Sequence, residues 1–405
     1  NPCRLRSASS SLAEGTILFM SLDNKLKLFL NNKVVLFFLI ILATISVSYA
    51  LIIANTNGSM DFPYSPTKLF IDKINPYEYF LYSKEKSLII GVQYPVYAHA
   101  TFILFSPFSF LEWDLSRVTW SIINVLLGLL CSYIFLKKAE VNKFEFIFLI
   151  CIFCISTPFR NCIGNGQLSF LILLCFSAYF LNNIYIKSFF VGISYIKYSF
   201  MPIMAFTLFL KNGFKQLIIS GLFCFFGWIF FSFYLSQNIF ETLFQPIIVA
   251  LNGFDDTLTR GDLYTILSNI FEIDNSYVII FIIFIITFLF SKNLSKFNDK
   301  FLIINLMLIV SLFTFGHLIY DYVVLFPTFI YSFKNLKFLR AKISFIIVLY
   351  FWFGIRIIER IKMLITEANT IIPTNFDIIL NFFLLIFLYF LNLNLKSNSI
   401  LKNLS

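Results

Sequence analysis

Long apolar runs recur along the whole chain, and they constrain its fold more than any other feature. They lie at residues 33–53, 95–111, 118–136, 146–158, 167–185, 188–210, 217–235, 277–290, 301–315, 318–333, 343–358 and 377–393. Roughly 20 apolar residues in an α-helix cross a bilayer, so the pattern predicts an all-α polytopic integral membrane protein with about twelve transmembrane helices. The composition agrees, because 59% hydrophobic and 13% charged residues leave too little polar surface for a soluble globule.

The beginning of the chain differs from the rest. Residues 1–19 lack the Phe, Ile, Asn and Lys bias of the remainder, and we interpret them as upstream or added sequence. The run 33–53 is followed by further apolar runs and has no small-residue cleavage site behind it. It is therefore expected to be a retained signal-anchor. A closed β-barrel is disfavoured, because the runs are apolar on every side instead of alternating.

Basic residues predict the orientation, since Lys and Arg are retained on the cytoplasmic side. If twelve spans alternate, one side collects Lys25, Lys27, Lys33, Lys211, Lys215, Lys292, Lys296, Lys300, Lys334, Lys337, Arg340, Lys342, Lys396 and Lys402. Both termini are then cytoplasmic, and the loops 54–94, 236–276 and 359–376 face outward. The prolines at 63, 66 and 76 punctuate the first loop and predict short interfacial helices near 63–73 and 76–87. Strict alternation leaves one conflict, because it places Lys137, Lys138 and Lys143 outside.

Several function classes are not signalled. The net charge of +10 is explained by the positive-inside pattern and by anionic lipids, so no nucleic-acid partner is expected. The seven cysteines lie mostly in or beside apolar runs, which argues against a disulfide framework. Cys151 and Cys154 form CIFC in an apolar helix without a second pair, so zinc or redox chemistry is disfavoured. No dinucleotide, P-loop, zincin or nucleophile-elbow motif occurs in a usable context.

The informative residues are polar groups in or beside apolar runs, because such groups are costly in a bilayer and often line a cavity. They are Asp61, Gln167, Lys197, His317, Asp321 and Arg356. His317 and Asp321 are four residues apart, so on a helix they share a face and the carboxylate orients or charges the imidazole. The alternative is a helix-end pair that only satisfies itself. His99 lies in an apolar run and is expected to be a hydrogen-bonded packing residue.

The order of short motifs resembles the polytopic GT-C glycosyltransferases that use polyprenyl-phosphate sugars, in particular the bacterial mannosyl- and arabinofuranosyltransferase family. The matching elements are Asp61-Phe62, Asn75-Pro76-Tyr77, Tyr94-Pro95, Trp120 and Asn124, Gly166-Gln167, Lys197, and Tyr320-Asp321 through Pro327. Departures are Val96 for a second proline, Ser169 for the usual Asn, and Ser199 with the proline displaced to Pro202. The resemblance covers most of residues 33–330. It implies a GT-C-like catalytic module over 20–335. Past residue 335 only hydrophobic helices are recognised, and residues 336–405 are expected to form C-terminal transmembrane helices.

The resemblance assigns roles to these residues. Asp61 is the expected general base at the outer membrane surface, although an Asp before Pro63 is also a common helix N-cap. The expected substrate-binding residues are Tyr94, Gln167, Lys197, His317, Asp321 and Arg260. Lys197 would neutralise the leaving phosphate, with Arg260 or Arg356 assisting. The alternatives are snorkelling for Lys197 and a solvated ion pair with neighbouring acids for Arg260.

The expected substrates are a polyprenyl-phosphate sugar, of mannose or arabinofuranose type, and a cell-envelope glycan or glycolipid acceptor. The expected location is a bacterial cytoplasmic membrane, with the active site facing outward. No cofactor is required by the residues, and a divalent metal stays open. Two other functions stay open, a surface-polysaccharide polymerase and a transporter or flippase of lipid-linked sugars. The polymerase would place its key basic residues in two large late loops, whereas here the acid lies in the first loop. The transporter would show an inverted repeat, and none is evident.

Overall fold

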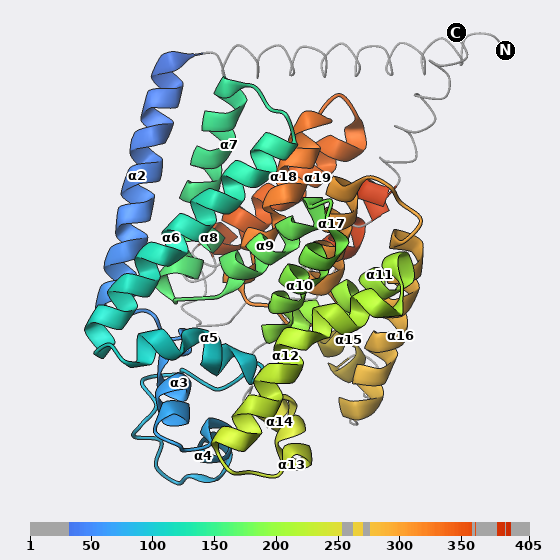
Figure 1. Cartoon of the computed structure of the whole chain (residues 1–405). Helices are drawn as coiled ribbons and strands as arrows, with labels where there is room; N and C mark the ends of the chain where they lie inside the picture. Colours follow the sequence, from blue (N-terminus) through green and yellow to red (C-terminus); the bar gives the residue numbers. More distant parts are fainter. Residues whose placement is uncertain are drawn as a thin grey trace, which may run out of the picture.

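The computed structural model describes residues 32–252, 262–269, 276–358, 361, 379–384 and 386–389. Within these ranges the chain is helical and contains no strand. Arg260 and the loop 359–376 lie outside the described residues, apart from residue 361. The long helices run roughly alongside one another, and several short helices collect at one end of the bundle (Figure 1).

Five helices of the described part are long and apolar enough to cross a membrane. They are α2 (Lys33–Thr56), α6 (Trp113–Lys138), α12 (Phe214–Tyr234), α16 (Ser276–Leu294), and α19 (Leu339–Leu349) with its continuation through η5 (Tyr350–Gly354) to Ile358. A sixth span is formed if α7 (Lys143–Ile155) and α8 (Thr157–Gly164) count as one helix bent by 57°. The structure thus shows a multi-pass helical protein, but not twelve continuous spans.

The other apolar runs fold into shorter pieces. They are α9 (Ser169–Ser177) with η1 (Ala178–Phe180), α10 (Ile184–Ile193), η2 (Ser194–Ile196), η3 (Tyr198–Phe200), α11 (Met201–Asn212), α17 (Lys300–Thr314), η4 (Ile319–Leu325) and α18 (Phe326–Lys334). The short helix α15 (Leu263–Asn269) lies in the predicted loop 236–276. Local capping explains the breaks. Ser156 accepts a hydrogen bond from the backbone of Phe159 at the start of α8, and Asn183 caps α10. The predicted span 188–210 is interrupted at Lys197, whose backbone is extended between η2 and η3.

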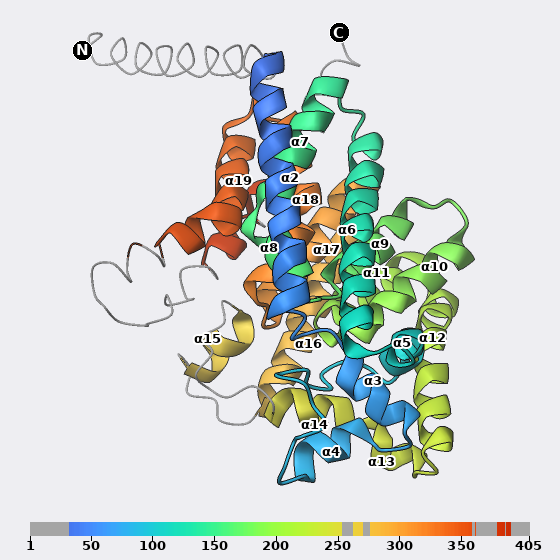
Figure 2. The same ribbon diagram turned by 90° about the vertical axis from the view of Figure 1, so that its left-hand side faces the viewer.

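Short helices form a layer at the end of the bundle where α2 terminates (Figures 1 and 2). This end layer consists of α3 (Tyr64–Ile71), α4 (Pro76–Tyr82), α5 (Ala100–Ser109), α13 (Ile239–Leu243) and α14 (Gln245–Asn252). Helices α3 and α4 confirm the two short helices that the prolines predicted. Asn75 caps α4 and Pro76 occupies its first turn, which fixes where that helix begins.

The span predicted at 95–111 is wrong. Its residues form the ten-residue helix α5, which lies across the end of α6 (Figures 1 and 2). Ten helical residues extend only about 15 Å, too short for a bilayer core. Removing this span reverses the direction expected for α6, and Lys137, Lys138 and Lys143 then lie at the end where α2 begins. These three lysines therefore share an end with Lys33, and Lys334, which bonds to the Ala139 carbonyl after α6, lies at the same end.

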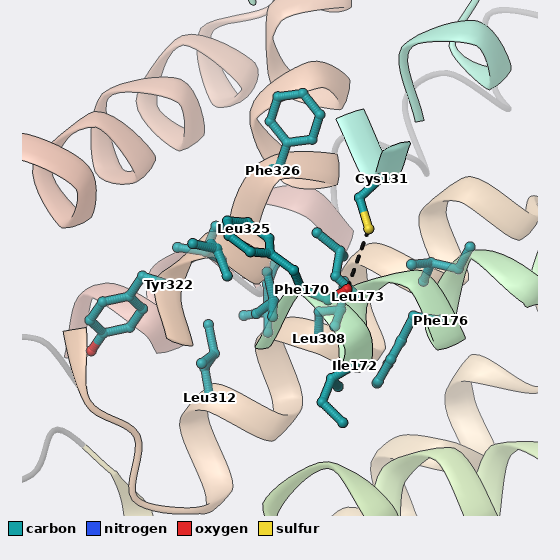
Figure 3. Packing of buried hydrophobic residues seen from close by; sticks show 14 of the residues in the cluster. Cys131, Phe170, Ile172, Leu173, Phe176, Leu308, Leu312, Tyr322, Leu325 and Phe326 are labelled. Atoms are coloured by element: carbon teal, nitrogen blue, oxygen red, sulfur yellow. Dashed lines mark hydrogen bonds between the residues drawn. The ribbon is translucent and has the colours of Figure 1, made fainter. Parts of the chain in front are cut away.

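The bundle core is apolar and tightly packed around α9. Figure 3 shows Phe170 and Leu173 of α9 between Leu308 and Leu312 of α17 and Leu325 and Phe326 at the junction of η4 and α18. Cys131 of α6 donates a weak hydrogen bond to the carbonyl of Phe170. The six cysteines described are free, and five of them are buried. This core holds together α8, α9 and η4, which carry part of the candidate site.

Candidate active site

The site begins in the loop between α2 and α3, which is bound by its backbone to the turn between α8 and α9. The N–H groups of Ser59 and Asp61 donate to the carbonyls of Gly164 and Asn165 at 2.7 and 2.9 Å. The two backbones approach so closely that residue 58 must be glycine, because a Cβ on Gly58 would lie 2.1 Å from the Gly164 carbonyl oxygen. The loop therefore places the Asp61 carboxyl group beside the start of α9.

Phe62 anchors the same loop. Its ring is fully buried and stacks against Trp120, with centroids 5.6 Å apart and planes 5° from parallel. The Trp113 ring also packs against Phe62, with ring centroids 6.3 Å apart. A buried aromatic ring contributes a large apolar area to packing, so the Phe62 ring is held in place. Phe62 therefore restricts the positions open to the neighbouring Asp61.

The Gly-Gln element forms the second part of the site. Gly166 has φ +71°, and a Cβ there would lie 2.8 Å from Cβ of Phe62, so both conformation and packing require glycine. The indole of Trp120 donates to the Gly166 carbonyl at 2.8 Å, and the Asn124 amide donates to the Gln167 carbonyl at 3.0 Å. Trp120 and Asn124 thus hold the Gly166-Gln167 turn in place.

A buried polar cluster around Asp321 forms the third part. Oδ1 of Asp321 accepts hydrogen bonds from Ser169 Oγ and Lys197 Nζ, each at 2.5 Å, and Oδ2 contacts His317 Nδ1 at 2.8 Å. Asp321 and His317 are almost fully buried, whereas the Lys197 side chain is 14% exposed. Ser169 replaces the Asn usual in the family pattern, and its hydroxyl supplies a donor to the same carboxylate.

The His317–Asp321 pair forms, but not on one face of an α-helix. Asp321 lies in the 3₁₀ helix η4, and His317 precedes that helix. The ring of Phe200 packs 4.7 Å from the His317 ring, while His317 Nε2 is buried without a hydrogen-bond partner in the described protein. Because Nδ1 contacts the carboxylate, the carboxylate favours the tautomer with the proton on Nδ1 and the lone pair on Nε2.

Asp61 lies near this cluster and differs from Asp321 in its surroundings. Burial raises the pKa of Asp61 to about 6, while the Gln167 side chain and the Lys197 ammonium oppose the rise. The negative charge of Asp321 raises the pKa of Asp61 further. Asp61 therefore interacts electrostatically with both Asp321 and Lys197. A carboxyl group with a pKa near 6 is largely ionised at neutral pH and still accepts a proton readily.

The remaining predicted residues lie elsewhere. Tyr94 packs against Phe80 in the end layer, with ring centroids 4.7 Å apart. Arg260 lies outside the described residues, and Arg356 is exposed beyond the π-helical turn η5. His99 is a buried packing residue, as expected, and its Nε2 hydrogen bonds with the Thr242 carbonyl at 3.0 Å.

Two residues of the site, Tyr97 and Gln93, were not among the substrate-binding residues expected from the sequence. The hydroxyl of Tyr97 donates to Gln167 Oε1 at 3.2 Å, and Tyr77 donates to the Tyr97 carbonyl at 2.7 Å. Gln93 is buried, accepts from Ser65, and donates to the Ser59 carbonyl two residues before Asp61. Tyr97 closely follows the Tyr94-Pro95 motif, and this position could have identified it from the sequence as a residue of the site. Gln93 carried none, because its partners are distant in sequence.

The comparisons with known proteins give one positive result. Residues 95–294 match the model of glycosyltransferase family 87. The match covers just under half of the chain, includes Gln167 and Lys197, and leaves out Asp61, His317 and Asp321. No curated protein and no solved structure gave a significant match. This family is part of the GT-C-like group, so the match indicates a membrane glycosyltransferase.

Proposed function

We propose that the protein transfers a sugar from a polyprenyl-phosphate donor to a hydroxyl group of a glycolipid or glycan acceptor, with Asp61 as the general base. The family match supports glycosyl transfer. The choice of donor and of general base is supported by one observation, that Asp61 is a partly exposed acid with a raised pKa near Lys197. Transfer from a phosphate donor requires one group that accepts a proton and another that favours departing negative charge.

The two carboxylates have different roles in this proposal. Asp321 already accepts from Ser169 and Lys197 at one oxygen and contacts His317 at the other, so it orients these groups. Asp61 takes the proton of the acceptor hydroxyl as its oxygen attacks the anomeric carbon. Lys197 keeps further N–H donors beyond its bond to Asp321, and these face the leaving phosphate.

A lipid-linked donor suits the position of the site. Asp61 lies between the membrane-length helix α2 and the end layer, so the chemistry takes place where apolar helices give way to short helices and loops (Figure 2). A polyprenyl chain would lie along the apolar helix surfaces, while its phosphate reaches Lys197. The basic residues at the opposite end favour a cytoplasmic location for that end and an outward location for the site.

The test is sugar transfer by membranes that contain the protein, supplied with a panel of radiolabelled polyprenyl-phosphate sugars that includes mannose and arabinofuranose donors. Extracted cell-envelope lipids and glycans serve as acceptors, and membranes with the Asp61→Asn variant serve as the control. We expect label from one lipid donor to enter the acceptor only with the unaltered protein. Transfer that depends directly on a nucleotide sugar, without a lipid intermediate, would refute the donor assignment.

A further inference from the structure

Lysine ammonium groups gather at the end of the bundle opposite Asp61, around the turn that follows α9. The Lys187 ammonium lies 4.8 Å from the Tyr179 ring, and Lys138 lies 5.8 Å from the Phe180 ring. Lys300 donates to the Phe180 carbonyl at 3.2 Å. Three lysines from α6, α10 and α17 thus converge on residues 179–182, although they are far apart in sequence.

In the part of the chain that the structure describes, no acid forms an ion pair with these lysines. The charged groups that act on Lys187 are Lys300 and Lys211, which are both cationic. Lys211 and Lys300 bond to backbone carbonyls and the Asn182 amide, which are neutral acceptors. Asp299 is exposed, and its Oδ1 caps the start of α17.

Lys187 is the informative member of the group. It is 7% exposed, and the described protein contains no ion pair or hydrogen bond from its ammonium. Holding a mostly buried lysine beside two other lysines is unfavourable, because like charges repel and burial removes water from the ammonium. An anion bound among the lysines would remove both penalties.

We propose that Lys187, Lys211 and Lys300, with Lys138 at the edge, bind the phosphate of an anionic phospholipid headgroup. The apolar surface next to the cluster favours a lipid as the source of this phosphate. Ile186, Phe189 and Phe190 of α10 are each at least 40% exposed and extend away from the first turn of that helix. Acyl chains cover such a surface in a bilayer, and basic pockets between helices on the cytoplasmic side attract anionic headgroups. This site is separate from the proposed glycosyl-transfer site.

The experiment compares lipids retained by the purified full-length protein, counted by native mass spectrometry after equal supply of dioleoylphosphatidylglycerol and dioleoylphosphatidylcholine. We expect preferential retention of phosphatidylglycerol. Because one lysine near anionic lipid contributes about a fivefold change in binding, Lys187→Gln should weaken that preference about fivefold. Lys187→Arg keeps the charge and should retain the preference. Lys300→Gln is the second test if Lys187→Gln does not fold.

The matched control is Lys33→Gln, which removes an equal charge from the exposed start of α2. It should leave the preference unchanged. Equal retention of the two lipids would overturn the proposal, and so would an equal loss in Lys33→Gln and Lys187→Gln, since that would reflect net charge alone. In a separate arm, inorganic phosphate should not raise the melting temperature, whereas phosphatidylglycerol should. Stabilisation by phosphate alone would show that the site binds a free anion instead.

Discussion

At the scale of single residues, the two acids near Lys197 differ in how far their hydrogen-bonding capacity is used. Both oxygens of Asp321 are engaged by other side chains. The Asp61 carboxyl group interacts with the Gln167 side chain, which lowers its pKa only in part, and its backbone N–H holds the loop to the Asn165 carbonyl. An acid that already accepts from strong donors is a poor base, whereas one with a raised pKa is a better one. Asp61 is therefore the stronger candidate for proton transfer.

Replacing each acid separately tests this division. Asp61→Asn should lower turnover by roughly a hundredfold or more, the usual contribution of a general base, while donor binding is retained. Asp321→Asn should instead weaken donor binding and lower stability by about 3–5 kcal/mol, because it breaks a buried ion pair. Turnover, donor affinity and melting temperature of both variants are the measurements. Near-normal transfer by folded Asp61→Asn protein would leave Asp61 as a structural residue of the loop.

The raised pKa of Asp61 also predicts pH dependence. Turnover should increase as pH rises through about 6, because the base must be ionised, and should level off above about 7. Stability changes in the opposite direction. The folded protein binds the Asp61 proton more tightly than the unfolded chain does. Protonation of Asp61 therefore stabilises the fold below pH about 4, and this stabilisation is lost as pH rises through about 6.

Asp61→Asn should therefore have a higher melting temperature than the unaltered protein at pH 8 and a similar one at pH 4. Melting curves at both pH values, together with a pH–rate profile, check the prediction. A melting temperature that falls equally at both pH values would assign Asp61 a structural role and remove the basis for its raised pKa.

At the scale of elements, the site depends on close contact between two turns and less on any single helix. The turns at 57–61 and 164–167 meet through backbone hydrogen bonds, and glycines at both turns allow the approach. The Gly-Gln motif was recognisable in the sequence, and so were its Trp120 and Asn124 partners. What the sequence did not show was that the first-loop acid binds the turn before that motif, since a contact between residues about a hundred positions apart leaves no local pattern.

Helix lengths show a similar limit. Pro76 and its Asn75 cap act within one turn, so the short helix α4 was predictable from neighbouring residues. The predicted span at 95–111 failed because a ten-residue buried helix and part of a transmembrane helix have the same apolar composition. Likewise, the interruption at Lys197 is stabilised by Asp321, which lies 124 residues away. Hydropathy reports burial but not which neighbours provide it.

Glycine substitution tests the contact between the turns. Gly166→Ala should lower stability by about 1–3 kcal/mol, because alanine is strained at φ +71° and its Cβ would press on Phe62. Turnover should fall as well, since Phe62 positions Asp61. The matched control is Gly221→Ala in α12, where an added Cβ meets nothing within 4 Å and helix propensity favours alanine by up to about 1 kcal/mol. Equal melting temperatures for the two variants would contradict the role given to the Gly166 turn.

At the scale of the whole molecule, the two ends of the bundle have different chemistry. One end carries the short helices, their aromatic contacts and the loop that bears Asp61 (Figure 1). At the other end, Lys334 at the end of α18 bonds to the Ala139 carbonyl after α6, and Lys300 bonds to the turn after α9. These contacts bring lysines of α17 and α18 to the end of α6, where Lys137 and Lys138 lie. This polarity is what orients a membrane protein, because lysine-rich ends stay in the cytoplasm.

Cysteine labelling tests the resulting topology, which places residues 54–94 outside the cell and the turn after α6 inside. The variants are Ser87→Cys, in the exposed segment after α4, and Lys143→Cys, at the exposed start of α7. Cys224, which is partly exposed, and Cys3, which lies outside the described residues, are replaced by serine in both variants; the other five cysteines described are buried. An impermeant thiol reagent should label Ser87→Cys in intact cells and label Lys143→Cys only after permeabilisation. Strict alternation of twelve spans puts both positions outside, so labelling of both in intact cells would favour that arrangement and require α5 to cross the membrane.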